Sequence, residues 1–157
     1  MAQTMVANCL SNKKILDGYD NRFNVFSDLC FTNFNIHIEA NRFFRVMDRD
    51  YPGSYFIYNT RDTERWIQSR LNHSYNDVTL KSRFFSIFNT TDIEVLKKIW
   101  RNEKSQFEFE LREYFKNSSK FVTIDIESDN VSEAMSSFLG LKFNEEHWRK
   151  LNVTVDC

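Results

Sequence analysis

Two spacings of apolar residues alternate along this chain and predict alternating helices and strands. Apolar residues three to four positions apart predict amphipathic helices over residues 1–16, 33–50, 63–71 and 92–116. Short β-prone runs predict strands at residues 23–27, 54–60 and 120–126. The run at 54–60 is almost continuously aromatic and β-branched, which is typical of a central strand buried on both faces.

Capping signals mark the ends of several predicted helices. Asp62 stands where an N-cap is needed, and Asn130 followed by Glu133 forms a capping box for a helix over residues 131–139. Gly140 then closes that helix. Strands that alternate with helices indicate βαβ units, so the chain is predicted to be α/β, with a parallel sheet flanked by helices.

Composition supports one domain over residues 1–157. Hydrophobic residues make up 41% of the chain and charged residues 27%, which supplies an ordinary core and excludes disorder for most of the length. Three Gly and one Pro are too few for the frequent turns of a β-sandwich or barrel.

Charge and cysteine content exclude further classes. The net charge of −1 provides no general attraction to nucleic acid or to an anionic membrane. The 16 Phe fall mainly at core spacing, which disfavours an RNA-binding surface. Three widely separated Cys form neither a disulfide framework nor a metal motif. The chain also has no signal peptide and no spanning run, so we expect a cytoplasmic protein without a metal.

Ligands of parallel sheets bind beyond the carboxyl ends of the strands, so the residues that follow each predicted strand are the first candidates. Arg61 is the most informative, because it lies between an apolar strand and the start of a helix, where the backbone N–H groups favour an anion. Ser69, two turns into that helix, could bind the same anion. An ion-pair role on the surface is the alternative for Arg61.

The segment Tyr51-Pro-Gly-Ser-Tyr-Phe-Ile-Tyr-Asn-Thr-Arg-Asp-Thr-Glu-Arg-Trp-Ile-Gln-Ser69 resembles a motif of the sulfotransferases. That motif binds the 3′-phosphate of 3′-phosphoadenosine 5′-phosphosulfate, the sulfonate donor. A second, weaker similarity runs from Tyr114 through the predicted strand at 120–126 to Leu141, and the resemblance covers residues 38–150 in all.

The resemblance implies a P-loop-like fold and a sulfotransferase activity on a hydroxyl or amine of a carbohydrate or small molecule. It implies that Arg61 and Ser69 bind the donor phosphate, with further phosphate contacts from Arg149 and Lys150. The acceptor would lie against the variable segments 30–36 and 72–91.

One part of the family pattern is missing. Sulfotransferases hold the phosphosulfate in a Gly-rich loop after a strand, whereas this chain has glycine only at positions 18, 53 and 140. Residues 1–16 resemble the helix that follows the loop. We therefore expect an N-terminally truncated domain; the alternative is a protein that has lost half of the donor site.

The resemblance further implies a His or Glu as the general base. His37, Asp28 and Glu39 are the candidates by position, and His37 needs the smallest pKa adjustment near neutral pH. His73 could line the acceptor opening. The competing hypothesis is a non-catalytic remnant that serves as an interaction module or homodimer.

Overall fold

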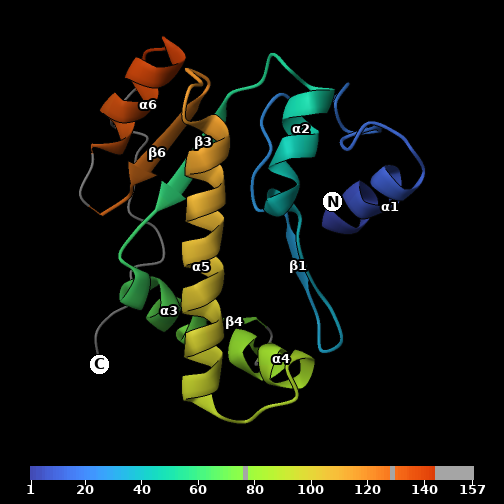
Figure 1. Ribbon diagram of the computed structural model, residues 1–157, viewed down its shortest axis with the longest axis vertical. Helices are drawn as coiled ribbons and strands as arrows, with labels where there is room; N and C mark the ends of the chain where they lie inside the picture. Colours follow the sequence, from blue (N-terminus) through green and yellow to red (C-terminus); the bar gives the residue numbers. More distant parts are fainter. Residues whose placement is uncertain (76–77, 128–129, 144–157) are drawn as a thin grey trace.

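The computed structural model describes residues 1–75, 78–127 and 130–143 and shows an α/β chain with a small parallel sheet flanked by helices. Figure 1 shows its long helix α5 (Ile93–Phe115) lying across the strands β3 (Phe56–Thr60) and β6 (Phe121–Asp125). The short helix α6 (Val131–Leu139) packs against β6. In the described ranges, no helix has both the length and the apolar character that a bilayer span requires.

The parallel pair confirms two of the three predicted strands. Phe56 is in register with Phe121, and Thr60 is in register with Asp125. Phe56 N–H donates to the Lys120 carbonyl, and Ile126 N–H donates to the Thr60 carbonyl. The main-chain groups of the even-numbered residues of β3 therefore point to β6, and those of Ile57 and Asn59 point to the opposite edge.

In the part of the chain that the structure describes, β3 pairs with β6 alone and is an edge strand, so the prediction of a central strand buried on both faces was wrong. Its burial alternates, and Ile57 is 39% exposed. Phe56 and Tyr58 face α5 and pack with Phe107, Leu111 and Phe115. On the other face, Tyr55 meets Phe138 of α6 edge to face. The side chains at the even-numbered positions of β3 thus contribute to the core, whereas those at the odd-numbered positions remain exposed.

The predicted strand at residues 23–27 was also wrong. These residues form no regular structure, and Val25 is 85% exposed. The neighbouring sequence forms an antiparallel hairpin instead, β1 (Cys30–Thr32) with β2 (His37–Glu39). Asn33 closes its turn, because its side-chain oxygen accepts from Asn35 N–H and Ile36 N–H. High β propensity does not make a strand without a hydrogen-bonding partner.

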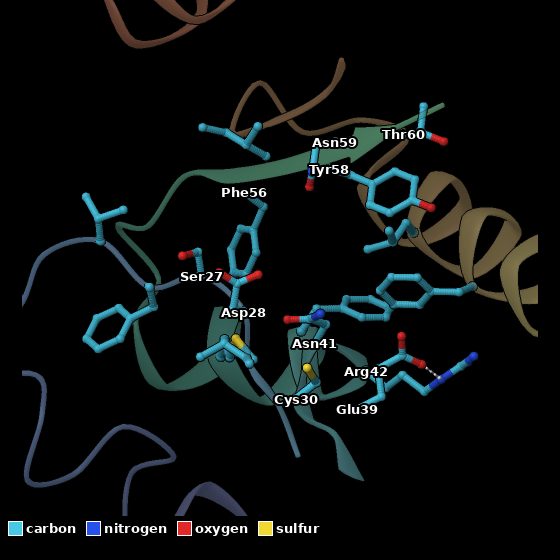
Figure 2. Close-up of a pocket in the computed structure, with 18 of the residues that line it drawn as sticks. Ser27, Asp28, Cys30, Glu39, Asn41, Arg42, Phe56, Tyr58, Asn59 and Thr60 are labelled. Atoms are coloured by element: carbon cyan, nitrogen blue, oxygen red, sulfur yellow. Dashed lines mark hydrogen bonds and ion pairs between the residues drawn. The ribbon is translucent and has the colours of Figure 1, made fainter. Parts of the chain in front are cut away.

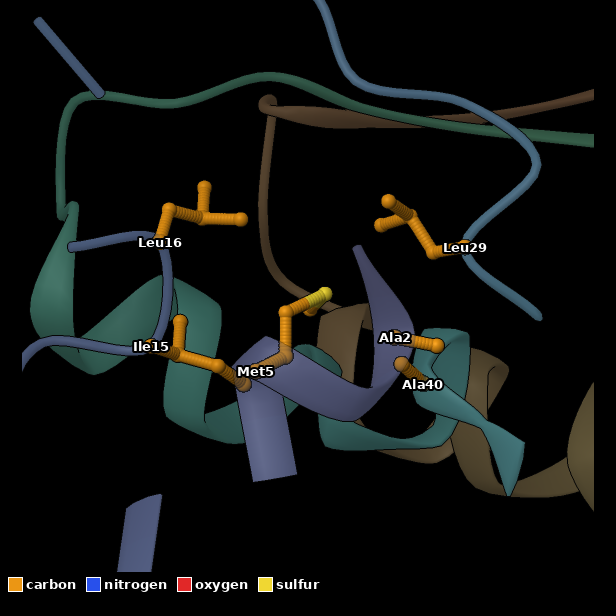
Figure 3. Packing of buried hydrophobic residues seen from close by; sticks show 6 residues of the cluster. All are labelled: Ala2, Met5, Ile15, Leu16, Leu29 and Ala40. Atoms are coloured by element: carbon orange, nitrogen blue, oxygen red, sulfur yellow. The ribbon is translucent and has the colours of Figure 1, made fainter. Parts of the chain in front are cut away.

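The hairpin shortens the helix predicted over residues 33–50. A 3₁₀ turn, η1 (Ala40–Phe43), follows β2 and leads into α2 (Phe44–Asp50). The first helix is shorter than predicted as well, because α1 (Ala2–Leu10) ends before a series of turns. A small core holds these parts together, as Figure 3 shows for Ala2, Met5, Ile15, Leu16, Leu29 and Ala40.

The remaining helices follow their capping signals. Asp62 caps α3 (Thr63–Asn72), Asp92 caps α5, and Asn130 caps α6, each by accepting a backbone N–H. Gly140 ends α6 in the left-handed conformation with φ 65°. The polar segment 72–91 contains more structure than expected: β4 (Ser74–Tyr75), β5 (Val78–Thr79) and α4 (Leu80–Ile87).

Candidate functional site

A cavity of about 1690 Å³ lies between β3, the β1–β2 hairpin, the irregular segment before it and α5. Figure 2 shows side chains from these elements around the opening, with Phe56 and Tyr58 of β3 on one side and Asp28, Cys30 and Asn41 on the other. Every residue of β3 lines the cavity, odd and even alike. The open edge of the strand, rather than one of its faces, therefore forms this wall.

Four of the predicted site residues line this one cavity: Asp28, His37, Glu39 and Arg61. Asp28 and His37 thus share a cavity with Arg61, but they were chosen as residues that follow a predicted strand at 23–27, and that strand does not form. Asp28 and the β2 residue His37 do not follow a strand of the parallel sheet. They reach the cavity because the hairpin folds back towards β3. Their chemical roles stay predictions.

Arg61 follows β3 directly and is held by groups that come after it in the chain. Its Nε lies 3.5 Å from Glu127 Oε1, and its Nη2 donates to the Arg65 carbonyl at 3.3 Å. The Arg61 Nε is buried yet makes no hydrogen bond to any described residue. The guanidinium is therefore ion-paired but not saturated, and an anion at the start of α3 would have to take the place of the Glu127 carboxylate.

The other predicted phosphate-binding residues do not line the cavity or lie outside the described residues. Ser69 is half-buried in α3 but does not line the cavity. Arg149 and Lys150 lie outside the described residues, as does His147. His73 lines the cavity at the end of α3, where the acceptor opening was expected.

His37 is fixed by its neighbours. Its Nδ1 lies 2.7 Å from the Thr32 hydroxyl, and its ring meets Phe84 edge to face at 4.8 Å. Burial lowers the pKa of His37; Arg70 and Arg42 lower it further, whereas Glu39 opposes them. The imidazole is thus neutral near pH 7, the state that a general base needs.

The two carboxylate candidates differ in their partners. Glu39 accepts from Arg42 Nε at 3.0 Å, which ties its charge to that guanidinium. Asp28 sits in the left-handed region with φ 51°, an unusual conformation that places it at the cavity wall. Asp28 has no ion pair among the described residues, so it would not have to break one to act as a general base. Glu39 would have to act beside Arg42.

The sequence reading missed a polar network at the carboxyl end of β3. Lys104 of α5 is 8% exposed, and its Nζ donates to Glu108 Oε1 at 2.6 Å and to Thr60 Oγ1 at 3.2 Å. The hydroxyls of Thr60 and Tyr58 donate to the same Glu108 oxygen. A lysine within the apolar stripe of a helix, four residues after Trp100, was the available signal.

This network keeps Glu108 charged. Burial opposes that charge, but the hydrogen bonds from Lys104, Thr60 and Tyr58 outweigh it and lower the pKa of Glu108. Burial and the neighbouring Glu108 raise the pKa of Tyr58. Lys104 therefore adds a positive charge to the cavity wall, and the Glu108 carboxylate already neutralises this charge.

Comparison with protein-family models, with curated proteins and with solved structures finds no match to this chain. The sulfotransferase resemblance therefore rests on the sequence alone, on the motif around Arg61 and the weaker one from Tyr114 to Leu141.

Proposed function

We propose that this chain is a sulfotransferase-like domain that transfers a sulfonyl group to a hydroxyl or amine of a carbohydrate or small molecule. One observation carries the proposal: Arg61 directly follows β3 of the parallel pair, retains a buried Nε without a hydrogen bond, and opens on the large cavity. A cation at the carboxyl end of a parallel strand, beside the N-terminus of α3, suits a phosphate.

The co-substrate is 3′-phosphoadenosine 5′-phosphosulfate, which supplies the sulfonyl group when bound. Arg61 would hold its 3′-phosphate, and this requires the guanidinium to exchange Glu127 for the phosphate. Ser69, which makes no hydrogen bond to a described residue, is the predicted second contact. The sequence contains no Gly-rich loop to hold the 5′-phosphosulfate. Residues of this chain are therefore proposed only for the 3′-phosphate end of the donor.

The acceptor would bind in the cavity, where a neutral His37 would take the proton of its hydroxyl or amine. The Thr32 hydroxyl orients the imidazole for this task. Asp28 and Glu39 are the alternative bases in the same wall. General base catalysis typically contributes about 10²- to 10⁴-fold to a rate, which sets the loss expected for His37→Ala in an active form.

Calorimetric titration with adenosine 3′,5′-bisphosphate tests the donor site. Loss of a charge-assisted contact costs about 1.5–3 kcal/mol, so Arg61→Ala should weaken binding roughly 10- to 150-fold. Arg61→Lys should restore part of the affinity, because a point charge cannot reproduce a two-pronged contact, and Ser69→Ala should cost less than Arg61→Ala.

Arg65→Ala is the matched control, because Arg65 shares Glu127 with Arg61 but its side chain is 70% exposed. It should bind the nucleotide like the parent. A parent that shows neither heat nor a thermal shift at millimolar nucleotide would refute the donor site. So would an Arg61→Ala variant with unchanged affinity.

A second function, as a non-catalytic interaction module or homodimer, is favoured by the open edge of β3. Among the described residues β3 pairs only with β6, and the main-chain groups of Ile57 and Asn59 point to the unpaired edge. A two-stranded parallel sheet is unusual, since parallel sheets are normally wider and covered. This edge could accept a further strand.

Sedimentation of the parent at micromolar concentrations, beside Ile57→Lys, tests the homodimer form of this hypothesis. A charge on an edge strand discourages pairing, so a dimer built on β3 should dissociate in the variant. A parent that sediments as a monomer at all concentrations excludes the homodimer, and nucleotide binding is measured independently of this result.

A further inference from the structure

Arg70, in the last turn of α3, is a cation enclosed by aromatic rings. Its guanidinium carbon lies 4.6 Å from the ring centre of Trp66, 4.7 Å from that of Trp100 and 5.0 Å from that of Phe84. These rings come from α3, α5 and α4. Three helices thus fix one guanidinium in place, and Arg70 also lines the large cavity.

The hydrogen-bonding capacity of this guanidinium is unused. Among the described residues, the side chain of Arg70 makes no hydrogen bond and no ion pair within 4.0 Å, and its Nε is buried without an acceptor. Aromatic faces attract a cation but satisfy N–H donors only weakly. A guanidinium has five N–H donors, and a buried one is normally paired with a carboxylate or several carbonyls.

Nearby carboxylates influence Arg70 without contacting it. Burial lowers the pKa of Arg70, and Glu39, Glu103 and Cys30 oppose this effect electrostatically. Glu39 accepts a hydrogen bond from Arg42 Nε, and the Arg42 guanidinium also donates to the main-chain carbonyl of Glu103. Neither Glu39 nor Glu103 forms a hydrogen bond or an ion pair with Arg70, so the donors of its guanidinium are left to another acceptor.

We propose that Arg70 and the cavity wall around it bind the carboxylate of a small organic acid. The planar guanidinium matches a carboxylate with two parallel hydrogen bonds, and the aromatic rings hold it ready without consuming its donors. Glu39 and Glu103 also line the cavity and repel a doubly charged anion about twice as strongly as a singly charged one. A carboxylate is therefore preferred to a sulfate or phosphate dianion.

This site is separate from the ion-paired Arg61 and does not depend on the proposed sulfonyl transfer. If that transfer takes place, the carboxylate belongs to the acceptor molecule and places its hydroxyl or amine near His37, whose ring contacts Phe84 of the same cluster. If it does not, the carboxylate site remains as a binding property of the chain.

Tryptophan fluorescence offers a direct test, because Trp66 and Trp100 both contact Arg70. The chain has three Trp, so Trp148→Phe gives a parent whose signal comes from these two alone. Titration with sodium acetate, at ionic strength held constant with sodium chloride, should give a saturable change. Sodium sulfate should bind about 10-fold or more weakly.

Variants decide whether Arg70 is responsible. Arg70→Met keeps the bulk but removes the donors, and it should weaken acetate binding about 10-fold or more. Arg70→Lys should lie between Met and the parent, and it serves as the second variant if Arg70→Met unfolds. Arg65→Met, on the exposed side of α3, should leave the titration unchanged.

Three outcomes would overturn the proposal: a parent that gives no saturable change, an Arg70→Lys variant that binds acetate like the parent, or sulfate that binds as tightly as acetate. Nucleotide titration of the same proteins separates this result from the donor site. Arg61→Ala should weaken nucleotide binding and keep acetate binding, whereas Arg70→Met should weaken acetate binding and keep nucleotide binding.

Discussion

Arg61 precedes α3 and Arg70 lies in its last turn, and both line the same cavity, but their surroundings are opposite. Arg61 pairs with Glu127, whereas Arg70 has aromatic rings around it and no ion pair among the described residues. An ion pair between partly exposed groups contributes little and exchanges readily for another anion. Three aromatic rings hold the Arg70 guanidinium in a fixed position, so a ligand must bind to it there. One arginine is thus suited to exchange and the other to fixed recognition.

The largest effect on stability is expected from removing a ring of the aromatic cage that Trp66, Phe84 and Trp100 form around Arg70. Phe84 is 0% exposed and contacts Arg70, His37 and Trp100, so Phe84→Ala should lower the free energy of unfolding by about 3–5 kcal/mol. Phe109→Ala is the matched control, because Phe109 is 61% exposed, and its effect should stay within about 0.5 kcal/mol. Urea unfolding of both variants measures the difference. Equal losses would show that Phe84 is not part of a packed cage.

A smaller effect is expected from removing the partner of Arg61. Glu127→Gln frees the guanidinium, so adenosine 3′,5′-bisphosphate should bind roughly 2- to 5-fold more tightly, with a stability change below about 1 kcal/mol. Glu64→Gln, which removes an exposed ion pair between Glu64 of α3 and Arg101 of α5, should leave the nucleotide affinity unchanged. Weaker binding in Glu127→Gln would mean that Glu127 positions Arg61 for the nucleotide and does not compete with it.

The smallest expected effect is a change in the pKa of His37, which distinguishes Arg70 from Arg61 by their electrostatic influence on this residue. Burial lowers the pKa of His37, and Arg70 and Arg42 add to this effect. Arg70→Met should therefore raise the pKa of His37, as measured by proton NMR titration, whereas Arg61→Met should not change it. The His37 resonance is assigned by its loss in His37→Gln. Equal titration curves in Arg70→Met and the parent would remove Arg70 from the surroundings of His37.

The lowered pKa of His37 also determines in which direction the stability of the fold changes with pH. Because the pKa of His37 is lower in the folded state than its ordinary value of 6.5, the unfolded state takes up the proton first as pH falls. The contribution of His37 to stability is present above pH 6.5 and is lost as pH falls through the folded pKa. His37→Gln should remove this part of the stability profile in urea unfolding between pH 7 and pH 5.

Elements with strong local signals were predictable. The caps predicted at Asp62 and Asn130 and the apolar stripe of α5 place three helices correctly, because capping and helical periodicity act within a few residues. The parallel pairing of β3 with β6 followed from the alternation of elements. Arg61 was found in the same way, from its place between a strand and a helix.

What the sequence could not decide depends on distant partners. Residues 23–27 have strand propensity but no strand beside them, and residues 37–39 became a strand because residues 30–32 lie opposite. The cage around Arg70 joins residues from three helices, and the network at Glu108 joins α5 to β3. Local spacing determined which segments are helices, whereas the choice of partners across the chain decided which side chains meet in the cavity, because burial and hydrogen bonding are settled only between elements.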